Sequence, residues 1–187
     1  MIAINGLGRI GRLAFQGLEA AAPGGVAALN DPAELRSVLQ LMAFDSVHGP
    51  GPLVVEGHTR EGQDFLRVGG REIPLFHETD PAAIPFGGCG ARLVVEASGR
   101  FTRRADAARH LKDSVSHVII SAPSPDPDFT VILPLNGAGL DLARHRVISN
   151  ASCTAHATGP MLAVLERAFG LEAANLSTVH VATNDQR

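Results

Sequence analysis

The sequence contains no Trp and no Tyr, and only two of its 187 residues are Cys. These two, Cys89 and Cys153, are too few for the disulfide framework of a small secreted domain, and they fit a reducing compartment. No run of residues is apolar and long enough to span a membrane. The first residues, Met1-Ile2-Ala3-Ile4, follow no basic region of the kind that opens a secretory signal. We therefore expect a cytoplasmic protein without a membrane partner.

The charge balance also excludes one class of partner. The chain has 16 Lys and Arg residues and 19 Asp and Glu residues, which gives a formal net charge of -3. A nucleic-acid-binding protein normally carries an excess of basic residues, so we expect no nucleic-acid partner. With 45% hydrophobic and 19% charged residues, the composition is typical of globular proteins. The length suffices for one domain and part of a second.

A glycine-rich turn near the N-terminus predicts a dinucleotide site. Ile2-Ala3-Ile4 has the pattern of a buried strand, and Gly6-Leu7-Gly8-Arg9-Ile10-Gly11 follows directly. The next apolar residues then recur at helical spacing. In such a strand-turn-helix unit, Gly6 permits the tight turn, Gly8 lets the backbone approach a pyrophosphate, and Gly11 lets helix and strand pack closely. The N-terminus of the helix offers free N–H groups to the phosphates.

An acidic residue, Asp31, follows the second expected strand, Val26–Leu29. It lies about 20 residues after the glycine turn, where an acid binds the ribose hydroxyls of adenosine and repels a 2′-phosphate. This position favours NAD over NADP. The alternative is that Asp31 is the N-cap of a helix over 33–42, since Asp-Pro is a common helix start.

Strands and helices alternate along most of the remaining chain. Short antiparallel strands are expected at 53–56, 65–68 and 72–76, a helix at 102–111, and parallel strands at 93–97, 117–121, 129–133 and 147–148. Ser98-Gly99-Arg100-Phe101 follows one of these strands, at the edge of the sheet where a second ligand contact is expected. The alternation predicts an α/β fold with a doubly wound, Rossmann-type parallel sheet.

Cys153 lies between an expected strand and a helical pattern at 159–169. The positive end of a helix dipole favours thiolate over thiol, and a thiolate there is a nucleophile. Ser152 and Thr154 add hydroxyls that can cap the helix or contact an anion. His180, on a strand expected at 176–183, is a candidate base. The alternatives are a small buried Cys and a structural His.

Eight sequence blocks, taken together, resemble the glyceraldehyde-3-phosphate dehydrogenase family. They occur in family order at residues 4–12, 30–32, 44–49, 80–85, 95–101, 119–124, 148–154 and 178–186. The resemblance implies that Cys153 forms a thiohemiacetal with glyceraldehyde 3-phosphate and that His180 acts as base. A hydride then passes to NAD, and inorganic phosphate releases the resulting thioester as an acyl phosphate in glycolysis or gluconeogenesis.

The resemblance also assigns binding positions, with no metal site and with a homo-oligomer, a tetramer in the family. The phosphate-site positions are Ser152, Thr154 and Thr183. The cofactor positions, including those of the glycine turn, are Asn5, Gly6, Gly8, Arg9, Ile10, Gly11, Asp31, Ser98, Gly99, Phe101 and Ser121. Residues 1–149 would form the NAD-binding domain, and residues 150–187 would begin a second, catalytic α+β domain.

Three departures limit what the resemblance implies. Thr154 is followed by Ala155-His156-Ala157 instead of Thr-Asn-Cys, Pro134 replaces a usual Gly, and Thr79 replaces a common Arg. The chain also covers about half of a family member, so we expect weak activity or none from these residues alone. Two other functions stay open: a sister activity on erythrose 4-phosphate, and a truncated paralogue that binds NAD or assembles with a partner without catalysis.

Overall fold

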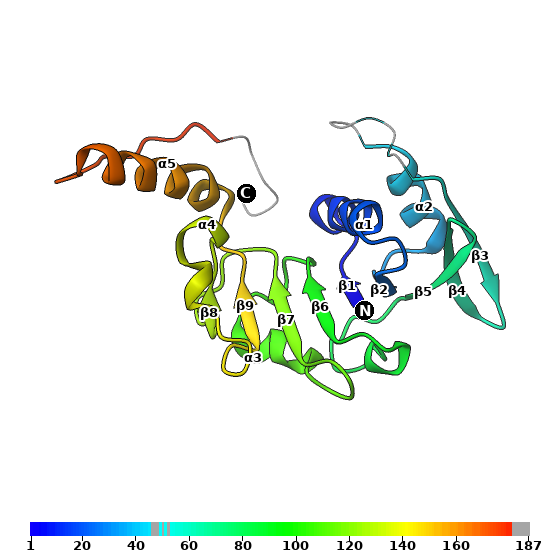
Figure 1. Cartoon of the computed structure of the whole chain (residues 1–187). Helices are drawn as coiled ribbons and strands as arrows, with labels where there is room; N and C mark the ends of the chain where they lie inside the picture. The colour runs from blue at the N-terminus through cyan, green and yellow to red at the C-terminus, as the bar shows by residue number, and fades with distance from the viewer. Residues whose placement is uncertain (46–48, 50, 52, 181–187) are drawn as a thin grey trace.

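The protein is built around one nine-stranded sheet in the order β3-β4-β5-β2-β1-β6-β7-β9-β8. The computed structural model describes residues 1–45, 49, 51 and 53–180, and Figure 1 shows the sheet with its strands labelled. The strands are β1 (Ile2–Asn5), β2 (Val26–Asn30), β3 (Val55–Arg60), β4 (Gln63–Val68), β5 (Arg71–Phe76), β6 (Leu93–Glu96), β7 (His117–Ile120), β8 (Phe129–Thr130) and β9 (Val147–Ser149). Seven of them, from β5 through β8 in this order, pair in parallel.

Helices cover both faces of this sheet. The helices of the described residues are α1 (Arg9–Ala21), α2 (Leu35–Ala43), α3 (Arg104–Ala107), α4 (Leu133–Asn136) and α5 (Cys153–Phe169), of which α5 projects from the sheet, and the short 3-10 turns are η1 (Gly87–Cys89), η2 (Ala108–His110) and η3 (Gly137–Gly139). Successive residues of β1 point to opposite faces. Ala3 packs in a core with Ala107 of α3, and Ile4 packs in a second core with Phe15 of α1. Two cores on one sheet confirm the doubly wound α/β prediction.

The chain reverses its direction of winding at β1. This strand pairs with β2 on one side and with β6 on the other, and both pairings are parallel. The strands that follow β1 through α1 are therefore added on the β2 side, and the strands from β6 onward are added on the other side. In open α/β sheets, ligands bind at the carboxyl ends of the strands beside such a switch point. The fold thus places a ligand cleft after Asn5, Asn30 and Glu96.

Several elements differ in detail from the sequence-based expectations. Strand β5 pairs antiparallel with β4, as expected, but it also pairs in parallel with β2. The helix expected at 102–111 is one short α-helical turn followed by η2. The strand expected at 129–133 ends at Thr130, because Pro134 opens the helical turn α4. A Pro at this position fits a first helical turn but not the middle of a strand.

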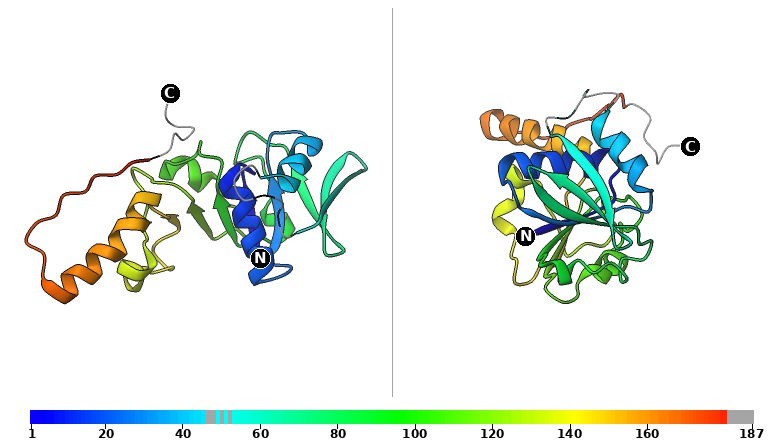
Figure 2. Two further views of the ribbon diagram at one scale, coloured as in Figure 1. Left: turned by 90° about the horizontal axis from the view of Figure 1, so that it is seen from above. Right: turned by 90° about the vertical axis from the view of Figure 1, so that its right-hand side faces the viewer.

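The C-terminal part of the described chain leaves the sheet. Helix α5 begins at Cys153, earlier than the apolar pattern predicted, and none of its residues is buried. Figure 2 shows α5 projecting beyond the β8 edge, with the segment after it running back toward the sheet. Residues 176–180 form no strand, because no other described strand lies beside them to share its hydrogen bonds. No described helix is long and apolar enough to cross a membrane.

Candidate functional site

A cleft of about 290 Å³ opens at the switch point of the sheet. This volume is near the lower end of small-molecule sites, roughly 300 Å³ and above. Residues after β1, β2, β5 and β6 form its wall. The lining residues are Asn5, Gly6, Gly8, Asn30, Asp31, Pro32, Glu78, Thr79, Ala97, Ser98, Arg100 and Phe101. The cleft therefore joins the glycine turn, the acid after β2 and the Ser98–Phe101 segment, which the sequence had suggested separately.

The glycine turn presents unused backbone donors to this cleft. Gly6 has φ +89°, and a Cβ on it would lie 2.5 Å from the Cα of Ser98, so only glycine fits there. Gly8 is the N-cap of α1, and no side chain caps this end of the helix. A Cβ at Gly8 would meet nothing within 4 Å. The first amides of α1 are thus free to donate to an anion beside Gly8.

Asp31 connects the glycine turn to the loop after β2. Its Oδ2 accepts a hydrogen bond of 2.7 Å from the Leu7 amide, and its Oδ1 accepts one of 2.9 Å from the Ala33 amide. Each carboxylate oxygen keeps a further lone pair for a ligand hydroxyl. The N-cap alternative is wrong, because Glu34 precedes the first residue of α2. The carboxylate instead holds two loops together at the cleft.

The cleft brings together only some of the expected cofactor residues. Asn5, Gly6, Gly8, Asp31, Ser98 and Phe101 line it. Arg9, Ile10, Gly11, Gly99 and Ser121 are not among its lining residues. Gly11 instead packs under the turn, where a Cβ would collide with the Gly6 carbonyl, which is the packing role that the motif predicts.

The expected cofactor positions did not include the lining residues Asn30, Pro32, Glu78, Thr79, Ala97 and Arg100. Arg100 does lie in the segment where a second ligand contact was expected, and Thr79 was noted only as the replacement of a common Arg. Most of them directly follow a residue or strand that had been identified. Glu78 and Thr79 were missed for another reason. They follow β5, which was expected only in an antiparallel hairpin, whereas its pairing with β2 carries its carboxyl end to the cleft.

A second site lies at the start of α5. Ser152 is the N-cap, and its Oγ accepts a hydrogen bond of 3.0 Å from the Ala155 amide. Cys153 is then the first residue of a 17-residue helix. Its exposed Sγ lies 3.2 Å from Nε2 of His180. The structure thus joins the expected nucleophile and the expected base, which are distant in sequence.

Hydrogen bonding lowers the pKa of the Cys153 thiol. The bond to His180 contributes most, and together with bonds from the side chain and backbone of Thr154 it outweighs the opposing effect of burial. Cys89 is different, because it is half-buried against a hydrophobic core and burial raises its pKa. A lower pKa at an exposed thiol increases the population of the nucleophilic thiolate. The two cysteines are therefore chemically distinct.

The surroundings of Cys153 form a shallow, mostly apolar depression. Its lining residues are Cys153, Thr154, Ala157, Thr158, Thr178, Val179 and His180. Thr154 thus lies beside the nucleophile, as expected for a phosphate-site residue. Thr183, the third expected phosphate-site residue, lies outside the described residues. Among the described residues, no group of three His, Cys, Asp or Glu side chains is arranged to hold a metal ion.

Comparison with known proteins identifies the family. Residues 1–104 match the family described as "Glyceraldehyde 3-phosphate dehydrogenase, NAD binding domain". The chain is 40% identical over 186 residues to glyceraldehyde-3-phosphate dehydrogenase 1 of Bacillus cereus, a match that covers 100% of this chain and 54% of that protein. It is 43% identical over 188 residues to glyceraldehyde-3-phosphate dehydrogenase of Priestia megaterium, again with 100% and 54% coverage. The chain spans about half the length of the curated relatives it matches. It belongs to the glyceraldehyde-3-phosphate dehydrogenase family, with an NAD-binding domain of that family at its N-terminal end.

Proposed function

We propose that this chain is part of a phosphorylating, NAD-dependent aldehyde dehydrogenase that acts on glyceraldehyde 3-phosphate. The observation that carries the proposal is the contact of 3.2 Å between Cys153 Sγ and His180 Nε2 at the N-terminus of α5. A thiolate beside an imidazole and a helix dipole is suited to covalent catalysis at a carbonyl carbon. The fold supplies the second component, an NAD-binding domain.

The proposed chemistry assigns a role to each atom of this pair. His180 Nε2 takes the thiol proton, and the Cys153 thiolate forms a bond to the aldehyde carbon. The carbonyl oxygen then takes this proton back from His180, which gives a thiohemiacetal and leaves the imidazole neutral. His180 then accepts the hydroxyl proton as the carbon loses a hydride and becomes a thioester. NAD, when bound, supplies the hydride acceptor. Inorganic phosphate attacks the thioester carbon, the C–S bond breaks, and the acyl phosphate leaves the restored thiolate.

The cleft at the switch point has the groups that NAD requires. The uncapped amides of α1 beside Gly8 suit the pyrophosphate. The Asp31 carboxylate, held by Leu7 and Ala33, suits the ribose hydroxyls and repels a 2′-phosphate. We propose the same cofactor role for Arg9, Ile10, Gly11, Gly99 and Ser121, through the shape of the turn and the neighbouring strand ends. We also propose residues 1–149 as the NAD-binding domain and 150–187 as the start of the catalytic domain.

Ser152, Thr154 and Thr183 are the proposed contacts of the substrate or attacking phosphate. Ser152 Oγ already accepts from the Ala155 amide, and its hydroxyl hydrogen remains for donation to an anion. The N-terminus of α5 favours negative charge at the same point. A phosphate oxygen here would thus meet a hydroxyl donor and a positive helix end.

Helix α5 exposes several apolar side chains beside the Cys153 site. Met161 is 53% exposed, Val164 is 65% exposed and Phe169 is 82% exposed. Such an apolar surface is typical of an interface. We propose that the catalytic site is complete only when this surface is packed, in a homo-oligomeric, cytoplasmic enzyme of glycolysis or gluconeogenesis. We accordingly expect these 187 residues alone to turn over glyceraldehyde 3-phosphate weakly or not at all.

Alkylation of the two cysteines tests the proposal. At neutral pH, iodoacetamide should modify Cys153 at least about tenfold faster than Cys89, since only Cys153 has a lowered pKa. Cys89→Ser provides a matched control that should leave the Cys153 rate unchanged, and Cys153→Ser should abolish any turnover. If both thiols react at similar rates, the nucleophile assignment fails. The chain is then better described as a nucleotide-binding module without catalysis.

A further inference from the structure

Three polar residues form one row across the floor of the cleft. Asn30, Asn5 and Glu96 are the last residues of β2, β1 and β6, and they are direct register partners. All three are buried, with exposed fractions of 1%, 3% and 2%. Because neighbours in a parallel register point to the same face, their side chains meet below the cleft. A buried polar row of this kind must satisfy its hydrogen bonds internally.

Glu96 accepts hydrogen bonds at both carboxylate oxygens. Oε1 accepts from the amide of Ser98 at 2.8 Å and from its hydroxyl at 2.5 Å. Oε2 accepts from Nδ2 of Asn5 at 2.6 Å and from Nε2 of His110 at 2.9 Å. A carboxylate is an acceptor only. Glu96 therefore forces the Asn5 amide to present its NH₂ group toward β6 and its carbonyl oxygen toward β2.

The orientation of Asn5 matches the one that the Glu78 backbone imposes on Asn30. Oδ1 of Asn5 accepts from Nδ2 of Asn30 at 2.8 Å. Nδ2 of Asn30 also donates to the Glu78 carbonyl at 2.9 Å, and its Oδ1 accepts from the Glu78 amide at 2.9 Å. If the Asn30 amide were reversed, two donors would face each other at one Glu78 contact and two acceptors at the other. The row thus has one allowed direction of hydrogen bonding, in which Asn30 donates to Asn5 and Asn5 donates to Glu96.

The residues that are hydrogen-bonded to the two ends of this row form walls of the cleft. Ser98 follows β6, Glu78 follows β5, and both residues line the opening. We propose that Glu96 is a positioning residue that fixes the hydrogen-bond direction of the row and thereby holds these two walls at the spacing that the dinucleotide requires. The cofactor part of this inference rests on the proposed function. The direction of the row does not, because it follows from the donors and acceptors alone.

His110 closes the row from below. It is 2% exposed and stacks on Phe86, with ring centroids 5.8 Å apart. Its Nε2 faces Glu96 and therefore carries a hydrogen, whereas its buried Nδ1 has no hydrogen-bond partner. The ring thus supplies one donor to the carboxylate at the cost of an unsatisfied nitrogen. In this tautomer, the His110 hydrogen bond therefore also requires an acceptor, and not a donor, at position 96.

Glu96→Gln is the direct test, because it retains the shape but introduces a donor. Hydrogen exchange of the Glu78 amide, on the opposite wall, should become about tenfold faster or more, while the Leu66 amide in β4 should be unaffected. If only the Ser98 amide exchanges faster, residue 96 does not control the hydrogen bonds at the other end of the row, and the inference is wrong. Glu19→Gln is the matched control. Glu19 is also a buried carboxylate and accepts from the Gly24 and Val26 amides, but, unlike Asn5 and Ser98, these partners do not line the cleft.

A double variant distinguishes the effect of the hydrogen-bond direction of the row from the effect of losing the negative charge of Glu96. Asn5→Asp with Glu96→Gln moves the carboxylate by one strand and again gives each contact of the row between Ser98 and Glu78 one donor and one acceptor. His110 must then adopt its other tautomer, in which Nε2 accepts from the new side chain at position 96. Asn5→Asp alone places two carboxylates at a contact that is now 2.6 Å. Both single variants should weaken NAD binding about tenfold, which corresponds to about 1.4 kcal/mol. The double variant should recover the slow exchange of the Glu78 amide, which does not depend on the cofactor.

The outcomes distinguish this inference from the proposed function. If the unaltered chain does not bind NAD, its cofactor role fails, and the exchange rates of the variants still decide the direction of the row. If the double variant exchanges as fast as Glu96→Gln, or if neither folds, the inference is overturned. Glu19→Gln should lower stability without changing the Glu78 exchange rate relative to global unfolding. Equal effects of Glu19→Gln and Glu96→Gln on NAD affinity would also overturn it.

Discussion

Cys153 Sγ and His180 Nε2 lie 3.2 Å apart although the residues are separated by 27 positions in the chain. The N-cap Ser152 orients the start of α5 beneath the sulfur, and the segment 171–180 returns from the far end of the helix to bring the imidazole to it (Figure 2). The pair therefore depends on a helix end and on a non-helical return segment. This geometry leads to the first prediction.

Replacing His180 with Ala should shift the pH dependence of Cys153 alkylation. The thiolate is the reactive form, and its population rises as pH passes through the thiol pKa. The hydrogen bond to His180 lowers that pKa, so the midpoint in the unaltered chain should lie below the usual value of about 8.5. His180→Ala should move the midpoint upward and slow alkylation at pH 7 about three- to tenfold. A rate profile of iodoacetamide labelling measures this, and an unchanged midpoint would contradict it.

Cys89 provides the internal reference for that measurement. Burial raises its pKa, so its labelling should rise only at a higher pH than that of Cys153. His180→Ala should leave the Cys89 profile unchanged. A shift of both profiles would indicate partial unfolding rather than loss of the His180 contact.

Gly6→Ala should mainly lower the stability of the fold, whereas Gly8→Ala should mainly weaken NAD binding. At Gly6, φ is +89° and a Cβ would lie 2.5 Å from the Ser98 backbone, so the variant should lose about 1–3 kcal/mol of stability. At Gly8, a Cβ meets nothing within 4 Å, and the fold should be retained. Gly8 nevertheless lines the cleft, so its methyl group should weaken NAD binding. Thermal unfolding and NAD titration of both variants separate the two effects, and equal stability losses would contradict the assignment.

Asp31→Asn should reduce the preference for NAD over NADP. The carboxylate accepts from the amides of Leu7 and Ala33, and an Asn side chain satisfies only one of them. We expect NAD to bind about tenfold more weakly, as for the loss of a charged acceptor. NADP binding should change less or improve, because the repulsion of its 2′-phosphate is removed. Parallel titrations with both nucleotides provide the measurement. Equal losses of NAD and NADP affinity would exclude a role of Asp31 in cofactor specificity.

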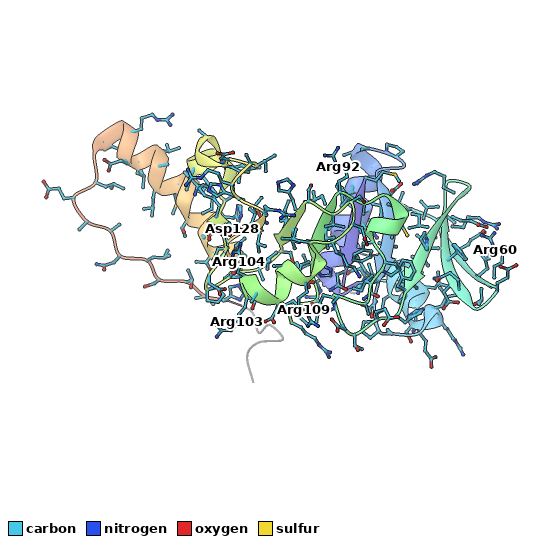
Figure 3. All side chains as sticks on the ribbon, turned by 90° about the horizontal axis from the view of Figure 1, so that it is seen from below. Arg60, Arg92, Arg103, Arg104, Arg109 and Asp128 are labelled. Carbon is cyan, nitrogen blue, oxygen red and sulfur yellow. The ribbon has the colours of Figure 1, made fainter. Side chains whose placement is uncertain are left out.

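Asp128→Asn should remove an acid-sensitive part of the stability. Burial raises the pKa of Asp128, but hydrogen bonds from Arg104 and from the amides of Val147 and Arg146 outweigh this effect and lower it. Figure 3 shows Arg104 beside Asp128, with Nε and Oδ1 2.5 Å apart. A lowered folded-state pKa stabilises the fold above the unfolded pKa of about 3.9, and the contribution disappears as pH falls through the folded value.

The variant should therefore be less stable at pH 7 by about 1 kcal/mol, since the Arg104 side chain is partly exposed. The difference should shrink below about pH 4. Urea unfolding at both pH values measures the change. A difference that stays constant with pH would show that the loss is one of packing rather than of charge.

The local patterns of the sequence determined the fold class and the family, and they led to the hypothesis of a dinucleotide site and a nucleophilic cysteine. The alternation of apolar runs predicted the sheet, the spacing of Gly6, Gly8 and Gly11 predicted the dinucleotide turn, and the family resemblance was confirmed. These features depend on neighbours in the chain. Backbone conformation and periodic burial are properties of short segments, so they can be read without knowing the tertiary structure.

The tertiary structure alone decided which distant groups meet. It placed Glu78 in the cleft, because β5 pairs with β2 as well as with β4, and it aligned Asn30, Asn5 and Glu96 in one row. It also showed His180 beside Cys153 without the strand that was expected to carry it. Strand register and the path of a return segment are set by packing between remote parts of the chain. For that reason no local pattern in the sequence specifies them.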